Sequence, residues 1–417
     1  MVLAEEGHDQ AREFLKEVVA DLGEPAADAL AAHIAYLLEL DRLAEQLGSE
    51  QELRVVRERT LTLQSSRFPP DHPAVLAARQ TLGATLATLG DDLGASEHFQ
   101  AVVDARTLRS APDDPDLLRA KLNLATILRR LGDLEQSREL AASVHEAWTR
   151  LLPPDHADLM AAKMSLASAL AELGDFEAAL ELEELVFETR KRVLPADHPH
   201  LMMVMLNLAS TRKTLGDFAG AKELEEVVLQ VYLRTLPADH PHLLVAKQNL
   251  GSTRHAAGDF AGAQAIAEEV LEARTRLLPP DHPELLAAKV NLAAVRWEVG
   301  DFAGAKELFE AVLDARRRSL PPDHPRLLFD MLNLAALRYE LGELEPAHEL
   351  FEAVLAARAR FLPDDHPDLL AAKQNLAITR LARGDVAGAR ELQEAVLAAR
   401  TRSLAPDHPE LLDAQQN

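Results

Sequence analysis

A strict period of 42 residues is the feature that most constrains how this chain can fold. Asp followed by His recurs with this spacing, and so does Gly followed by an acidic residue. The first ladder consists of Asp71, Asp155, Asp197, Asp239, Asp281, Asp323, Asp365 and Asp407, and one double step skips Asp113-Asp114. The second consists of Gly90, Gly132, Gly174, Gly216, Gly258, Gly300, Gly342 and Gly384. Self-similarity without insertion or deletion predicts a stack of repeated units rather than separate globular domains.

Each unit is predicted to form a pair of antiparallel helices. Between residues 283 and 299 apolar side chains recur at helical spacing, and Gly300 is a typical C-terminal stop. A second apolar segment follows Asp301, an N-cap residue type, and ends before Pro321, which cannot continue a helix. Two such helices cannot bury their apolar faces alone and must stack on neighbouring pairs. The expected fold class is therefore all-α.

The two ladders also divide the chain into segments. We expect eight 42-residue units over residues 71–406. Residues 26–70 resemble a degenerate first helix pair, because Gly48 lies 42 residues before Gly90, and residues 1–25 predict a capping helix at its open end. Residues 407–417 match the start of a further unit and stop within its first helix. This pattern predicts a truncated repeat and leaves room for a further domain C-terminal to Asn417.

Composition argues against several classes of function. The formal net charge of −24 disfavours nucleic-acid binding, because neutralising phosphates needs a clustered basic surface. The absence of cysteine excludes disulfides, thiolate nucleophiles and cysteine zinc sites. The start of the chain lacks the basic-then-apolar pattern of a secretory signal, and no apolar run approaches the ~20 residues that cross a bilayer. We therefore expect a cytoplasmic protein without nucleic-acid or membrane partners.

The repeat motif resembles that of a known family. A Leu-Ala pair in the first helix, a Gly-Asp turn, an Ala-x-x-Leu-Phe second helix and a linking Asp-His-Pro are seen in DHPELLAAKVNLAAVRWEVGDFAGAKELFEAVLDARRRSL, residues 281–320. This looks like a tetratricopeptide repeat of the 42-residue type found in kinesin light chains and many bacterial relatives. The resemblance covers residues 71–417. It implies a right-handed superhelical solenoid whose first helices line a concave groove, where partners usually bind.

The chain also departs from the kinesin light chain pattern. Kinesin light chains have two Asn where this chain has one, and Tyr where five repeats here carry Arg. They also have a long heptad segment that this chain lacks. The resemblance therefore implies the repeat family and not a role in kinesin transport.

The repeated Asp-His pairs could be chemical ligands or helix caps. A metal ion needs three or four ligands converging at about 2 Å, which one His and an adjacent Asp do not supply. No Ser, Thr or Cys recurs beside the pair, so no nucleophile–base arrangement is predicted. Asp or His before a Pro at the first helical turn can instead accept from exposed backbone N–H groups. The second unit has Asp114 in place of His and keeps Pro115, which favours the cap, and we expect neither a metal nor a cofactor.

An asparagine column on the first helices is the better functional candidate. Asn is unfavourable inside a helix, so its recurrence needs an explanation. Its amide both donates and accepts, which suits pairing with the backbone of an extended peptide, and the resemblance implies such a role. An inter-helix hydrogen bond that fixes the repeat geometry is the alternative, and the sequence leaves both open. The column consists of Asn123, Asn207, Asn249, Asn291, Asn333 and Asn375, with Thr81 and Ser165 in two units.

Other groove candidates surround this column. Residues four before, three after and seven after each Asn share its helix face, and the position three after is mostly small. The position six after varies in chemistry and includes Lys213 and His255. Aromatic side chains often dominate interface energetics, so the expected anchors are Trp297, Phe329 and Tyr339.

Five arginines that lie five residues after the Asn predict a structural ladder. Each has a Glu 28 residues earlier, on the second helix of the preceding unit, and where Leu128 and Leu170 replace the Arg the earlier residue is not acidic. In a buried ladder, removing one partner would cost about 3–5 kcal/mol. The expected pairs are Glu184–Arg212, Glu226–Arg254, Glu268–Arg296, Glu310–Arg338 and Glu352–Arg380.

Two functions fit these features. The first is a non-enzymatic protein–protein interaction scaffold that binds a peptide or helix of a partner in its groove. The alternative is the regulatory or sensor region of a larger multidomain effector, for example one with a C-terminal caspase-like protease, as the resemblance to bacterial relatives implies. No phosphate loop, Gly-rich fingerprint or nucleophile elbow is present, so we do not expect an enzyme.

Overall fold

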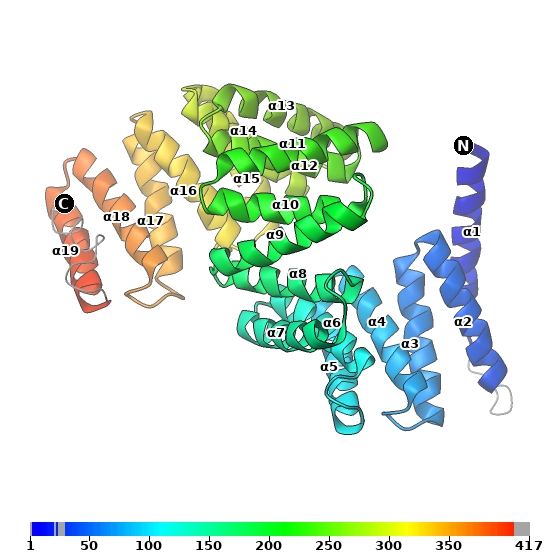
Figure 1. Cartoon of the computed structure of the whole chain (residues 1–417). Coiled ribbons are helices and arrows are strands. Elements are labelled where there is room, and N and C mark those ends of the chain that lie inside the picture. Colours follow the sequence, from blue (N-terminus) through cyan, green and yellow to red (C-terminus); the bar gives the residue numbers. More distant parts are fainter. Residues whose placement is uncertain (1, 21, 24–29, 404–417) are drawn as a thin grey trace. The chain divides into compact units, whose positions relative to one another are not determined.

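The computed structural model describes residues 2–20, 22–23 and 30–403, and over these residues all regular structure is helical. The chain forms two compact units, Met1–Gly216 (unit 1) and Asp217–Asn417 (unit 2). Within each unit the helices stack side by side in chain order, as Figure 1 shows, and each packs against the next. The predicted all-α stack of helix pairs is confirmed.

The helices of unit 1 are α1 (Val2–Ala20), α2 (Leu30–Leu47), α3 (Glu50–Arg67), α4 (Pro73–Thr88), α5 (Asp92–Arg109), α6 (Pro115–Leu131), α7 (Leu134–Leu151), α8 (Ala157–Glu172), α9 (Phe176–Val193) and α10 (Pro199–Thr214). Those of unit 2 are α11 (Phe218–Thr235), α12 (Pro241–Ala256), α13 (Phe260–Leu277), α14 (Pro283–Glu298), α15 (Phe302–Ser319), α16 (Pro325–Glu340), α17 (Leu344–Arg358), α18 (Pro367–Ala382) and α19 (Val386–Ser403). The even-numbered helices from α4 onward are the first helices of the repeats.

The turn between the two helices of a repeat follows directly from its sequence. In the repeat of α14 and α15, the first helix ends one residue before the predicted boundary, and Gly300 has a φ of 84°, which L-residues with a side chain rarely adopt. The Asp301 side chain then accepts from the backbone N–H of Gly304 at 3.0 Å and caps the next helix. This tight turn makes the two helices antiparallel neighbours.

The core lies between the helices of successive pairs. In unit 2, Leu292 and Phe309 are 2% and 1% exposed, and Phe309 shares one apolar cluster with Leu334 and Phe351. In unit 1, α1 packs against α2 and α3, with Leu15 buried, and Arg12 donates to the carbonyl oxygen of Leu47 at 2.7 and 2.9 Å. Within each unit the described helices therefore bury apolar faces against their neighbours, as a stacked array requires.

Part of the predicted organisation lies outside the described residues. This applies to residues 404–417, which include Asp407 and the proposed truncated repeat, and to the segment 24–29 before α2. Within the described ranges, none of the helices combines the length and the apolar character that crossing a membrane requires.

Candidate functional site

The Asp-His pairs are structural. The His is the N-cap residue of the first helix, and its Nδ1 accepts from the backbone N–H two residues later at 3.1–3.2 Å. In the second repeat Asp114 takes this place, and its side chain accepts from the backbone N–H of Leu117 at 2.9 Å. The predicted capping role is thus confirmed. Among the described residues, no three His, Asp or Glu side chains are grouped so that they could hold a metal ion.

The Asp of the pair has a role that the sequence analysis missed. Asp239 accepts from Arg276 at 2.6 Å, and Asp281 accepts from Arg318 at 2.7 Å. Each arginine lies at the end of the second helix of the same repeat. The ion pair therefore links the start of a repeat to its end. In most repeats the sequence has an Arg 37 residues after the Asp, and this spacing could have predicted the ion pair.

Replacing a capping histidine tests this assignment. We expect His282→Ala to lower the free energy of unfolding by about 0.5–2 kcal/mol, because the backbone N–H of Glu284 loses its acceptor. His282→Asp should keep most of the stability, since Asp114 performs the same function four repeats earlier in the chain. Urea denaturation followed by circular dichroism measures both variants, and an equal loss in the two would contradict the capping role.

All five predicted cross-repeat ion pairs are present. The N–O distances are 2.8 Å for Arg212–Glu184, 3.2 Å for Arg254–Glu226, 3.8 Å for Arg296–Glu268, 2.8 Å for Arg338–Glu310 and 3.5 Å for Arg380–Glu352. The expectation of a buried ladder is wrong, however, because the Arg side chains are 22–28% exposed and the Glu side chains 38–55%. Solvent screens such pairs, so each contributes about 0–1 kcal/mol rather than the larger cost of a buried pair.

The asparagine column lies on the first helices with its side chains half-buried, apart from the exposed Asn123. None of the six amide groups makes a hydrogen bond to another described residue, and Asn375 takes part in one only through its backbone oxygen. The alternative explanation, an inter-helix hydrogen bond that fixes the repeat geometry, therefore finds no support in the part of the chain that the structure describes. The amides are available to another molecule.

A groove of about 810 Å³ on unit 1 brings three repeats together. Asn123 of α6, Ser165 of α8 and Asn207 of α10 all line it, so the column position contributes one polar side chain per repeat. Met164 and Met203 also line the groove, and Met203 is 46% exposed. The sequence analysis did not name these methionines, although Met203 lies four residues before Asn207 on the same helix face.

The aromatic candidates differ in accessibility. Trp297 is partly buried, and its ring meets that of Phe309 edge-on at 6.4 Å. Tyr339 is also partly buried against the core of unit 2 and lines a pocket of about 320 Å³ with Ile378. Phe329 is 55% exposed and is therefore the most accessible of the three predicted anchors. Lys213 lies in the last turn of α10 and is not among the residues that line the unit 1 groove.

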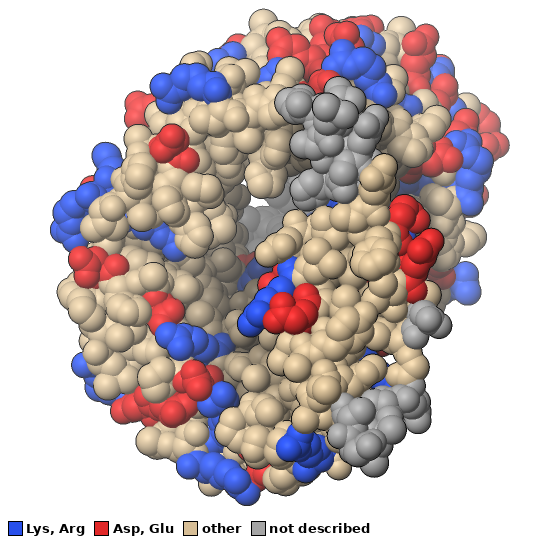
Figure 2. Space-filling view, turned by 90° about the vertical axis from the view of Figure 1, so that its right-hand side faces the viewer, with Lys and Arg blue, Asp and Glu red and all other residues tan. Residues whose placement is uncertain are grey.

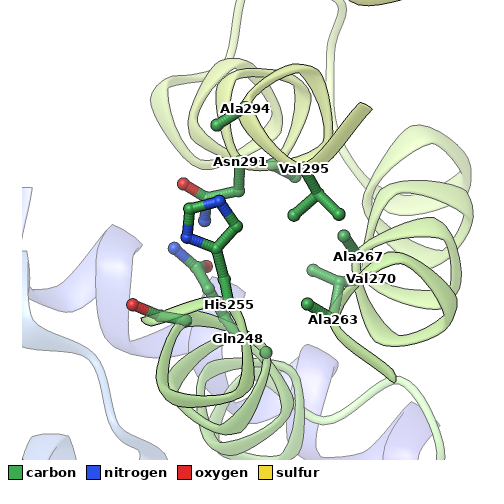
Figure 3. Close-up of a pocket in the computed structure, with 11 residues that line it drawn as sticks. Gln248, His255, Ala263, Ala267, Val270, Asn291, Ala294 and Val295 are labelled. Carbon is green, nitrogen blue, oxygen red and sulfur yellow. The ribbon is translucent and has the colours of Figure 1, made fainter. Parts of the chain in front are cut away.

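A second pocket, of about 90 Å³, opens in unit 2 between α12 and α14 and has α13 as its floor. Figure 3 shows Ala263, Ala267 and Val270 on the floor, with Gln248, His255 and Asn291 on the opposite side. The Nε2 atom of His255 is buried and has no hydrogen-bond partner among the described residues.

Charge is mixed on the face of the molecule that Figure 2 shows. Acidic and basic side chains alternate among uncharged ones, and no extended patch has a single sign. In the unit 1 groove, Asp158 accepts from Arg119 at 2.9 Å.

Comparison with known proteins identifies the class. One tetratricopeptide-repeat profile matches residues 116–192, 242–318 and 284–360, and another matches residues 201–242 and 369–410. These matches cover more than half of the chain, which therefore belongs to the tetratricopeptide repeat family. The repeats of this family define a protein-interaction scaffold. No curated protein sequence matches the chain.

Several solved structures are similar. A candidate kinesin light chain from Podosopora anserina with nearly identical TPR-like repeats is 30% identical over 49% of this chain and 98% of its own, with a TM-score of 0.46. The quorum sensor NprR from B. thuringiensis, in its apo form, is 13% identical over 89% of this chain and 99% of its own, with a TM-score of 0.63. A Rap protein is 12% identical over 85% and 94%, with a TM-score of 0.52. At these low identities, NprR and Rap show the shared fold alone.

Proposed function

We propose that this protein is a scaffold that binds an extended or helical peptide segment of a partner protein on its first-helix face. The observation that carries the proposal is the unit 1 groove, which Asn123, Ser165 and Asn207 line from three successive repeats. Its volume of about 810 Å³ falls within the usual range for ligand clefts, roughly 300–1,000 Å³.

The groove has the chemistry that a peptide needs. An Asn amide can donate to a peptide carbonyl and accept from a peptide N–H, and such amides repeat along the groove. Met164 and Met203 supply flexible apolar surface, which adapts to side chains of different shape. The similar Rap protein was solved in a complex with Competence and Sporulation Factor, so a fold of this kind accommodates a bound molecule in that protein.

The proposal predicts that two Asn amides contribute directly to peptide affinity. Peptides selected from a random displayed library against the full chain are titrated by calorimetry into wild type and the double variant Asn123→Ala, Asn207→Ala. We expect about tenfold weaker binding, because two hydrogen bonds of about 0.5–1.5 kcal/mol each are lost. The matched control is Glu181→Ala, Glu188→Ala, which changes two exposed residues of α9. Equal affinity of the folded Asn variant and wild type would remove the groove as the binding site.

A further inference from the structure

One position of the second helices contributes to the pocket on α12, α13 and α14. This position lies at the same place in every second helix and packs toward the neighbouring first helices. Phe309 and Phe351 occupy it with rings that are 1% and 4% exposed, and Glu183 and Glu225 occupy it with carboxyl groups in residues that are each 2% exposed. Ala267 occupies it in α13 and leaves space that no other side chain fills. The column consists of Phe99, Ala141, Glu183, Glu225, Ala267, Phe309, Phe351 and Gln393.

The walls and the mouth of this pocket differ in chemistry. Its inner surface consists of small apolar groups, among them Ala263, Ala267 and Val295. Polar side chains lie on the side away from α13, where Asn291, Gln248 and His255 approach one another (Figure 3). The Oε1 atom of Gln248 accepts from Arg274 of α13 at 2.7 Å, and this hydrogen bond fixes the side chain of Gln248. An apolar cavity with a polar rim suits an apolar side chain whose own backbone stays at the rim.

We propose that this pocket, here called the Ala267 pocket, is a specificity subsite that receives one aliphatic side chain, of Val, Ile or Leu, from a peptide bound along the first helices of unit 2. The proposal rests on the peptide-binding function proposed above. The amide of Asn291 pairs with a peptide group beside that side chain. Because the Asn column supplies Asn291, the pocket and an amide of this column lie together within unit 2.

The size of the pocket selects the class of side chain. Its volume of about 90 Å³ is below the ~150 Å³ of a cavity that takes benzene, so an aromatic ring is too large. Charged side chains are excluded because the inner walls offer no polar partner. The same lack of partners makes a buried water unfavourable, since a buried water typically makes about three hydrogen bonds. A branched aliphatic group is the remaining match.

The test uses a small defined probe. N-acetyl-leucine methylamide presents one leucine side chain between two peptide groups, and N-acetyl-glycine methylamide is the same molecule without the side chain. Titrated into the full chain with labelled Ala and Val methyl groups, the leucine probe should shift the NMR signals of Val270 and Val295, which line the pocket. The glycine probe should leave these signals unchanged.

A variant that fills the pocket completes the test. Ala267→Leu fills the pocket with a side chain of the class that it is proposed to receive, and thermal melting by circular dichroism checks that the variant folds. It should abolish the shifts of Val270 and Val295 and weaken peptides with an aliphatic residue about 10- to 100-fold. Ala265→Leu, on the exposed face of the same helix, is the control and should behave as wild type.

The outcomes separate this inference from the proposed function. Leucine-probe shifts that persist in Ala267→Leu, or their absence in wild type, overturn the subsite. If selected peptides still depend on Asn123 and Asn207 in that case, the proposed function stands alone. If the leucine probe shifts the pocket methyl groups only when Ala267 is present but no peptide binds, the pocket binds aliphatic groups and the proposed function fails.

Discussion

Replacing Arg316 with methionine is expected to lower the free energy of unfolding by about 3–5 kcal/mol at neutral pH. The guanidinium of Arg316 donates to Asp330 at 2.6 Å, and the Asp330 side chain is 0% exposed. Burial raises the pKa of Asp330, and Arg316 lowers it in part. Removing the arginine leaves a buried carboxylate without its charge partner, which must remain ionised at a high cost or take up a proton.

The double variant Arg316→Met, Asp330→Ala is the matched control. The residues at the position of Asp330 in adjacent repeats are Ala288 and Ala372, both buried, so alanine fits this place in the stack. We expect the double variant to recover most of the loss, since no buried charge remains. The single variant should also recover as the pH falls, because protonation neutralises Asp330. Urea midpoints at two pH values measure both effects, and a double variant as unstable as the single one would show that packing alone is responsible.

Stability is expected to fall as the pH rises from about 4.5 to 7, because of Glu183 in α9. This residue is 2% exposed, and burial raises the pKa of its carboxyl group from 4.5 to about 7, while a hydrogen bond with Thr211 lowers it in part. The folded chain therefore holds a proton that the unfolded chain releases in this interval. The stabilisation is fully present below the unfolded pKa and is lost as the pH passes through the folded value, by about 3 kcal/mol.

Glu183→Gln should remove this dependence. The amide resembles the protonated acid in shape and carries no charge, so we expect the variant to be more stable than wild type at pH 8 and similar to it at pH 5. The control is Glu181→Gln, on the exposed face of the same helix, which should keep the wild-type slope. Urea midpoints of the three proteins between pH 5 and 8 give the comparison, and parallel curves for wild type and Glu183→Gln would refute the assignment.

The fold could be predicted from the sequence because its signals are local and repeat in phase. The end of a first helix depends on Gly300, the start of the next on Asp301, and the cap of a repeat on His282, each within a few residues of the element that it controls. The ion pairs could be predicted in the same way, because an acidic and a basic residue recur at a constant sequence separation. Glu310 and Arg338 are one such pair.

Burial and open space could not be predicted in the same way. The ion-pair ladder lies at the surface because its long side chains extend from the helix edges, a feature that sequence offset does not encode. Trp297 looks like an exposed anchor in a variable column, yet its ring packs edge-on against Phe309. The Ala267 pocket is space that the side chains of three neighbouring helices leave open. A comparison of the column that contains Ala267 and Phe309 would have drawn attention to it.

The central claim is that a peptide binds to the first-helix face, and hydrogen exchange of the full chain with and without a selected peptide tests it most directly. We expect slower exchange in α6, α8 and α10, whose residues line the unit 1 groove, while the control helices α5 and α7 of the same unit stay unchanged. Protection confined to second helices, with none in α6, α8 and α10, would contradict the account.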